Sequence, residues 1–211
     1  MDGEIKMRIV CTTDTHWNHA QMVEYCGRPT DFEERVYNGL LSFCQSGDVL
    51  IHFGDICIGN DEDVHRKYIQ TLPYRHRWLV RGNHDKKSDS WYMDHGWTWV
   101  GSLMRSKYFG QRVMLSHKPQ PWHSEEEWDL NIHGHFHNAF GPEPEAHPEV
   151  TKYFIRDEAQ LVDRVIQGQS RHVLLALEYT GYQPVLLRTL VERGVASRQL
   201  WGENKLVEVI S

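Results

Sequence analysis

The chain has few cysteines, and they lie far apart. Its 211 residues include four, Cys11, Cys26, Cys44 and Cys57, and no two of them form a Cys-x-x-Cys pair. A disulfide-stabilised small fold or a thiolate zinc site needs closely spaced cysteines, so both are disfavoured. The pattern fits free thiols in a reducing compartment.

Long apolar runs are also missing. No stretch approaches the roughly 20 residues that a membrane-spanning helix needs. The N-terminal sequence MDGEIKMRIV is too short and too charged for a signal peptide. We therefore expect a cytoplasmic protein with no membrane partner.

Basic residues are neither numerous nor clustered. The chain has 23 Lys and Arg against 29 Asp and Glu, a formal net charge of −6. No run of basic residues forms a track for a phosphate backbone, so a nucleic-acid partner is not expected, whereas a homo-oligomer stays open. Histidine is the unusual feature, with fourteen in the chain, and it is the commonest metal ligand among the side chains.

The order of short apolar runs and amphipathic segments predicts a mixed α/β fold. Asp31 followed by Glu34 predicts a helix start, and Phe109-Gly110-Gln111 predicts a hairpin turn. No linker-like composition separates the halves, so one domain over residues 1–211 with two sheets is expected. The predicted strands are residues 5–11, 49–53, 77–80, 97–100, 107–109, 112–116, 130–132 and 172–177, and the predicted helices are residues 31–45, 61–71 and 157–167.

Polar residues follow five of these strands at the point where each strand ends. Loops at the carboxyl ends of strands form the usual ligand crevice of an open α/β sheet. Each loop delivers one to three residues with oxygen or nitrogen donors. The residues are Asp14 and His16, then Asp55, then Asn83 with His84 and Asp85, then His117, then His135 and His137.

A ligand set of this size suits two divalent ions. Two ions need six or more protein ligands, with at least one carboxylate shared between them to offset their repulsion. A pair of ions about 3.5–4 Å apart stabilises an in-line phosphoryl displacement from both sides. The mixture of imidazole, carboxylate and amide groups favours Mn, Fe, Co, Ni or Zn, with Mn our first expectation.

Each motif taken alone has an ordinary structural explanation. Asp-x-His arises by chance, and Gly-Asp is a common turn. Gly-Asn-His-Asp can be a capped turn before a helix, and Gly-His-x-His can be a turn at an edge strand. The ordered combination, with every member at a strand end, is far more specific than any of its parts.

The motifs resemble, in order and content, those of the calcineurin-like metallophosphoesterase superfamily: D-x-H, G-D, G-N-H-D, H and G-H-x-H between Asp14 and His137. The resemblance implies two facing mixed sheets flanked by helices, with His84 as the acid that faces the substrate. Residues 138–171 match no part of the family pattern and are expected to be an insertion. By the resemblance, one ion is held by Asp14, His16, Asp55 and His137, and the other by Asp55, Asn83, His117 and His135, with Asp55 bridging.

Two shorter segments refine the resemblance. Residues 13–19 (TDTHWNH) and 25–29 (YCGRP) are similar to a bacterial and phage-type branch of the superfamily. The Gly- and Arg-rich signature that Ser/Thr protein phosphatases carry after the Gly-Asp motif is missing, because residues 56–59 read ICIG. A protein substrate is therefore not expected.

The implied chemistry is hydrolysis of a small phosphoester. Hydroxide held between two dications attacks phosphorus, and the ions take up the charge that develops on the phosphoryl oxygens. We predict that His84, held by neighbouring Asp85, donates a proton to the leaving oxygen. No certain basic residue lies within the motifs, so phosphodiesters are expected to be preferred over phosphomonoesters, which are largely dianionic near pH 7.

Three residues near the motifs are candidate substrate contacts: His19, Arg28 and Lys118. His19 can equally be a polar residue at a helix start, and the two basic residues can be solvated surface charges. His52 and His133 lie within apolar runs and are predicted to be hydrogen-bonded core residues. The alternative functions are a nuclease with the same two-metal chemistry and a metal-binding scaffold without catalysis.

Overall fold

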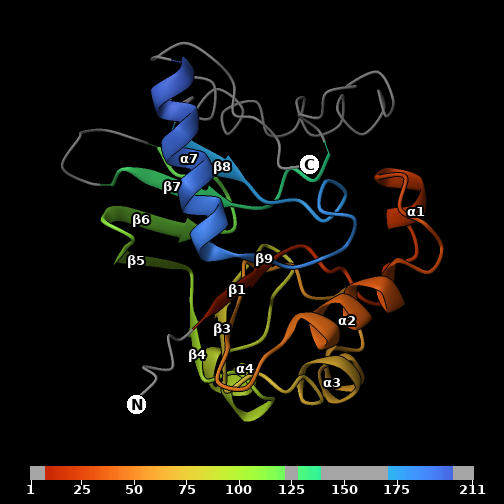
Figure 1. Cartoon of the computed structure of the whole chain (residues 1–211). Coiled ribbons are helices and arrows are strands. Elements are labelled where there is room, and N and C mark those ends of the chain that lie inside the picture. Colours follow the sequence, from red (N-terminus) through yellow and green to blue (C-terminus); the bar gives the residue numbers. More distant parts are fainter. Residues whose placement is uncertain (1–7, 122–127, 139–170, 202–211) are drawn as a thin grey trace.

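The computed structural model describes residues 8–121, 128–138 and 171–201, and these ranges form two β-sheets with helices around them (Figure 1). The predicted fold of two mixed sheets flanked by helices is confirmed. No helix among the described residues is long and apolar enough to cross a bilayer. Most of the predicted insertion at residues 138–171, including the predicted helix at 157–167, lies outside the described residues.

The first sheet has the strand order β4-β3-β2-β1-β9. Its first four members pair in parallel, whereas β9 runs antiparallel to β1 and makes the sheet mixed. The strands are β1 (Ile9–Thr12), β2 (Val49–His52), β3 (His76–Val80), β4 (Trp99–Gly101) and β9 (Val185–Leu186). The helices between these strands are α1 (Met22–Tyr25), α2 (Phe32–Phe43), α3 (Asp61–Val64), the π-helix η1 (His65–Ile69) and α4 (Asp89–Asp94).

The second sheet has the order β5-β6-β7-β8. An antiparallel hairpin joins β5 (Leu103–Tyr108) to β6 (Gln111–Ser116), and β7 (Leu130–His133) and β8 (His172–Leu174) then add in parallel. Phe109 (φ 52°) and Gly110 (φ 80°) form the corner of the hairpin, as predicted, because two successive positive φ angles match the twist of the strands. Helix α7 (Leu187–Trp201) lies alongside this sheet (Figure 1).

Alternation along the strands divides the core into two layers. Val10 and Leu50, which are paired in register, face the helices that follow β1 and β2. Their neighbours Cys11 and Ile51 face the other way and pack against the second sheet and α7. Both faces of the first sheet are therefore buried, which explains why β2 reads as a continuous apolar run.

The predicted elements differ from the observed ones mainly at their ends. Asp31 stands at the start of α2, but its carboxylate accepts a hydrogen bond from Arg35 Nε at 2.8 Å and caps no backbone amide. The predicted strand at 172–177 ends at Leu174, although Leu175 N–H still donates to His133 O at 2.8 Å. The predicted helix at 61–71 contains a π-helical turn, and β9 and α7 were not predicted.

Candidate metal centre

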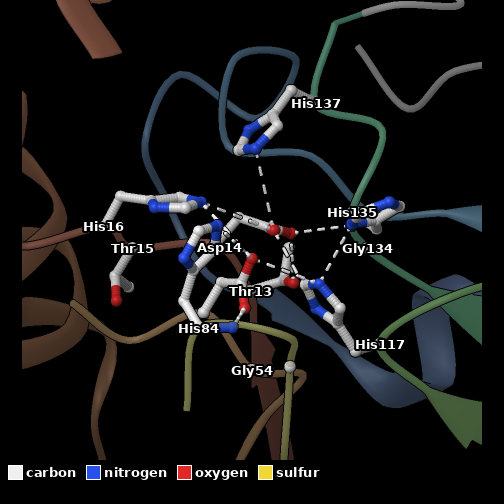
Figure 2. A network of polar contacts seen from close by, with 12 residues as sticks. Thr13, Asp14, Thr15, His16, Gly54, His84, His117, Gly134, His135 and His137 are labelled. Carbon is white, nitrogen blue, oxygen red and sulfur yellow. Dashed lines mark hydrogen bonds and ion pairs between the residues drawn. The ribbon is translucent and has the colours of Figure 1, made fainter. Parts of the chain in front are cut away.

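The loops after β1, β2, β3, β6 and β7 bring the predicted ligands to one place. Figure 2 shows the imidazole rings of His16, His84, His117, His135 and His137 arranged around Asp14. Two sets of side chains each have ligand atoms within 4.8 Å of one another. The first set is Asp14, His16 and His137, and the second is Asp55, His117 and His135.

The first set leaves polar atoms at distances that suit an ion. Asp14 Oδ1 lies 3.9 Å from His16 Nε2 and 3.8 Å from His137 Nε2, too far for a hydrogen bond. Asp14 Oδ1 and His16 Nε2 are buried and have no hydrogen-bond partner in the part of the chain that the structure describes. Two ligand atoms that are each about 2.1 Å from one ion lie at most about 4 Å apart, so the geometry fits.

The second set is tighter and centres on His117 Nε2. This atom lies 3.3 Å from Asp55 Oδ2, 3.1 Å from Asn83 Oδ1 and 3.2 Å from His135 Nδ1. The other ring nitrogen, His117 Nδ1, lies 2.7 Å from the carbonyl of Phe53 and donates to it. A neutral ring with its proton on Nδ1 presents the lone pair of Nε2 to the site, which is the usual way to orient a metal-binding histidine.

Asp55 lies between the two sets. Its Oδ2 is 3.7 Å from His16 Nε2 on one side and 3.3 Å from His117 Nε2 on the other. Its Oδ1 accepts a hydrogen bond from the backbone N–H of His84 at 2.8 Å, which fixes the carboxylate. This position suits a carboxylate shared by two ions.

The protonation states also fit metal binding. Burial lowers the pKa of His16 well below its ordinary value and lowers that of His135 to about 2, so both rings are neutral. Burial alone would lower the pKa of His117, but the carboxylates of Asp55 and Asp14 outweigh it and raise the pKa to about 9. The buried carboxylates therefore attract positive charge, which a cation can supply in place of that proton.

The ligand loops have an unusual backbone. Nine non-glycine residues in the described ranges have a positive φ, and five of them are candidate ligands. Such angles cost of order 1–3 kcal/mol per residue and concentrate where function requires them. The five are Asp14 (φ 47°), His16 (47°), Asp55 (55°), His135 (74°) and His137 (48°).

One glycine brings two of the loops together. Gly54 has a φ of 89°, and a Cβ on it would overlap the backbone of Gly82. The loops after β2 and β3 therefore touch backbone to backbone, which places Asp55 beside Asn83 and His84. An alanine at residue 54 would push these loops apart.

His52 connects the first two ligand loops from within the core, in agreement with its prediction as a hydrogen-bonded core residue. Its Nδ1 accepts from Gly54 N–H at 3.0 Å, so its Nε2 carries the proton and donates to Thr15 Oγ1, also at 3.0 Å. Thr15 Oγ1 in turn donates to the carbonyl of Ile56 at 2.9 Å. Burial lowers the pKa of His52 to about 3, which keeps the ring neutral and this chain of donors intact.

A family-level comparison agrees with this geometry. The family model of the calcineurin-like phosphoesterases matches residues 7–142, more than half of the chain and all of the candidate ligands. The chain belongs to the calcineurin-like phosphoesterase family. Membership implies a metal-dependent phosphohydrolase.

Two proteins resemble this phosphoesterase over nearly their whole length. The uncharacterized protein MJ1445 of Methanocaldococcus jannaschii is 23% identical over 201 residues, which cover 92% of this chain and 96% of that protein. The crystal structure of AQ665 from Aquifex aeolicus, a protein of unknown function, has a TM-score of 0.63 at 23% identity and covers 88% of this chain and 98% of that one. The fold therefore extends beyond the residues that the family model matches.

In the phosphoesterase, the side chain of Asp85 contacts other groups than predicted. Its carboxylate accepts hydrogen bonds from the backbone N–H groups of Gly82 (2.7 Å), Asp55 (2.9 Å) and Ile56 (3.1 Å). The prediction that Asp85 holds the His84 ring is corrected, because the hydrogen bonds of Asp85 in the described part of the chain go to the backbone of the two loops. Asp85 positions the ligand loops instead.

Arg28 also differs from its prediction as a phosphate contact. Its side chain is fully buried and hydrogen-bonded to Glu178 and to the carbonyls of Asp14 and Thr15. A guanidinium in this position cannot reach a substrate without leaving its partners, so the predicted role is corrected. Glu178 was not predicted, because it lies outside every motif. Its one signal in the sequence is an acidic residue directly after an apolar run.

The remaining predicted residues lie at the edge of the site. The side chain of His84 is 41% exposed, and its Nε2 is 3.9 Å from Asp55 Oδ2. His19 Nδ1 lies 3.2 Å from His16 Nδ1, and its ring centroid is 6.5 Å from that of His84. Lys118 is close enough to His135 to help lower its pKa, after burial and His117. His84, His19 and Lys118 thus lie close to the candidate ligands, and their contact with a substrate stays a prediction.

Proposed function

We propose that this phosphoesterase binds two divalent ions and hydrolyses small phosphodiesters. The observation that carries the proposal is the position of Asp55, whose Oδ2 lies within 3.9 Å of nitrogens of His16, His84 and His117. A carboxylate between two sets of imidazoles is what a pair of ions needs. When bound, two such ions supply a nucleophile by lowering the pKa of water and offset charge on the phosphoryl oxygens.

The ligands divide into two proposed groups. Asp14, His16, Asp55 and His137 hold the first ion, and Asp55, Asn83, His117 and His135 hold the second. Imidazole, carboxylate and amide donors favour Mn, Fe, Co, Ni or Zn, and we choose Mn²⁺ for the first tests. The buried nitrogens and carboxylate oxygens described above support this assignment.

His84 is the proposed proton donor. Its exposed ring is at the open side of the site, next to Asp55, whereas the imidazoles of the two ligand groups are buried. A group that meets the departing oxygen must be reachable by the substrate, and His84 fulfils this condition. Its proton would pass to the leaving alkoxide as the bond to phosphorus breaks.

The preference for diesters follows from the few basic side chains that the described residues bring to the site. A monoester is largely a dianion near pH 7, and sites that bind it usually add Arg or Lys to the ions. The guanidinium of Arg28 is buried and held by Glu178, so of the two predicted basic contacts Lys118 alone stays in reach. A diester has one charge and needs no more than the ions.

Metal analysis tests the ion pair. Wild-type protein loaded with Mn²⁺ should contain two ions per chain, and Asp55→Asn should lose occupancy at both positions. A single ion in fully loaded wild type would contradict the proposal.

Substrate comparison tests the preference. We expect kcat/KM for bis-nitrophenyl phosphate to exceed that for nitrophenyl phosphate at the same pH and Mn²⁺ concentration. A tenfold advantage for the monoester, about 1.4 kcal/mol in transition-state stabilisation, would overturn the preference. Single-stranded DNA belongs in the same panel, because rapid cleavage would favour the nuclease alternative.

The four cysteines are free, which fits a reducing compartment, and we place the proposed activity in the cytoplasm.

A further inference from the structure

A buried ion pair lies directly behind the first group of ligands. Arg28 follows α1, Glu178 follows β8, and their side chains are 0% and 6% exposed. Arg28 Nη2 and Nε lie 2.7 and 2.8 Å from Glu178 Oε1. We propose that Arg28 and Glu178 are positioning residues for the first ion and hold His137 in its metal-binding tautomer. This inference rests on the proposed function.

The pair contacts the first ligand loop through its backbone. Arg28 Nη2 donates to the carbonyl of Asp14 at 2.9 Å, and Nη1 donates to the carbonyl of Thr15 at 3.2 Å. These carbonyls belong to the turn in which Asp14 and His16 take positive φ angles. The guanidinium therefore stabilises a backbone shape that the two ligands require and that is otherwise costly.

The pair also contacts the ring of His137, on the nitrogen that faces away from Asp14. Glu178 Oε1 is 3.2 Å from His137 Nδ1, while Nε2 of the same ring is 3.8 Å from Asp14 Oδ1. Nε2 can bind an ion when its lone pair is free, which in a neutral ring requires the proton to be on Nδ1. Glu178 supplies the acceptor that keeps it there.

Without Glu178 the neighbouring charge would favour the wrong tautomer. Arg28 Nη2 lies 3.3 Å from His137 Nδ1 and can only donate. With no carboxylate beside it, Nδ1 would become an acceptor for Arg28 and the ring proton would move to Nε2. The atom needed for the ion would then be blocked.

The same place could be mistaken for a third metal site. Ligand atoms of Cys26, His137 and Glu178 lie within 4.8 Å of one another. The guanidinium of Arg28, however, already provides the positive charge at this point. Burial also raises the pKa of the Cys26 thiol, with Glu178 adding to the effect, which disfavours a thiolate at this point. The cluster is better explained as the support of His137.

The contacts of Arg28 and Glu178 predict that loss of the pair weakens binding of the first ion and leaves binding of the second unchanged. The hydrogen bonds of the pair reach Asp14, Thr15 and His137, which belong to the first ligand group or its loop. The rings and amide of the second group have other partners, since His117 contacts Phe53 and Asn83. A general defect in folding would weaken both ions, whereas a positioning role weakens the first alone.

The test is a titration of Glu178→Met with Mn²⁺. Calorimetry measures the affinity for each ion, and electron paramagnetic resonance measures the spin coupling between the two ions. We expect the second ion to bind as in wild type and the first to bind 10–100-fold more weakly, with the coupled signal replaced by that of a single Mn²⁺. Glu178→Gln keeps an oxygen acceptor and should restore most of the affinity. Equal weakening by Met and Gln would overturn the acceptor role.

Two further variants separate positioning from loss of the fold. Arg28→Met combined with Glu178→Met leaves no unpaired buried charge, and it should fold yet still bind the first ion more weakly than wild type. The matched control is Arg112→Met, which breaks an ion pair with Asp129 (2.7 Å) at the far end of β6 and should leave both ions unchanged. Failure of the proposed function would show as fewer than two ions in wild type. Failure of this inference would show as two ions bound equally well by wild type and Glu178→Met.

Discussion

The histidines of the site differ most in how far water can reach them. The side chains of His16, His117 and His137 are 3–5% exposed, whereas that of His84 is 41% exposed. Replacement of His84 should therefore affect the chemical step and spare the ions. We expect His84→Ala to keep its Mn²⁺ content and to lose about 10²–10⁴ in kcat for diesters with alkyl leaving groups.

Leaving-group dependence is the control for this role. Nitrophenolate departs without a proton, so the loss caused by His84→Ala should be much smaller for bis-nitrophenyl phosphate. Losses of equal size for both leaving groups would remove His84 from the role of proton donor.

Asp85, unlike His84, is expected to act on the backbone of the ligand loops and not on the substrate. An asparagine there can accept at one oxygen, but its NH₂ group would face backbone N–H donors that now have an acceptor. Asp85→Asn should therefore lower the free energy of unfolding by about 1–3 kcal/mol and weaken Mn²⁺ binding. Urea unfolding and metal titration measure the two effects. A loss of turnover that depends on the leaving group, with stability unchanged, would contradict this positioning role.

At the residue scale, the sequence predicts the ligand residues at strand ends, but it does not predict contacts between residues that are far apart in the chain. Asp14, Asp55 and His117 could be found because each follows an apolar run. Glu178 could not be assigned, because its partner Arg28 is 150 residues away and only folding brings them together. The positive φ of Asp55 depends in the same way on the approach of Gly82.

At the element scale, His65 at the start of η1 gives the fold a sensitivity to acid. Its Nδ1 donates to the carbonyl of Asp61 at 2.8 Å, and its Nε2 is buried with no partner in the described ranges. Burial lowers the pKa of His65 to about 4 from an ordinary value of 6.5. Between these two values the unfolded chain binds a proton that the folded chain does not, so stability falls as pH falls, by up to about 1.4 kcal/mol per pH unit.

The variant His65→Phe should reduce this dependence. Phenylalanine can pack against Trp91, Tyr92 and Trp97, whose rings already surround the imidazole. Urea unfolding between pH 4 and 6.5, with EDTA present to exclude metal effects, should give a shallower slope for the variant. Parallel curves for variant and wild type would show that His65 is not the source.

The elements themselves were predictable to different degrees. Helix α2 follows from its apolar spacing, and the same spacing of Leu187, Leu190 and Val191 could have revealed α7. Strand β9 has two residues and no pattern of its own, because its position is set by pairing with β1. The π-helical turn of η1 likewise has no sequence signal.

At the scale of the whole molecule, each proposed ion takes ligands from both sheets. The first has Asp14, His16 and Asp55 from the first sheet and His137 from the second. The other joins Asp55 and Asn83 to His117 and His135. Ions that bind only the folded chain stabilise it by mass action, about 2.7 kcal/mol per ion at a hundredfold excess over the Kd.

Mn²⁺ should therefore raise the unfolding midpoint of metal-free protein, and EDTA should reverse the change. The Asp55→Asn variant should show a smaller increase in midpoint than wild type, because the substitution weakens the ligand that both proposed ions share. Thermal unfolding at several Mn²⁺ concentrations measures the shift. An unchanged midpoint in wild type would mean that the ions do not connect the sheets.

The distribution of the proposed ligands over two sheets also determines when the protein could acquire the proposed ions during synthesis. A nascent chain that has emerged up to β4 has folded at most the parallel part of its first sheet, and it has none of His117, His135 and His137. Each proposed ion would then lack at least one of its ligands. The proposed ions would therefore be taken from the metals that the cell offers after the second sheet has formed, not from those that the growing chain meets at the ribosome.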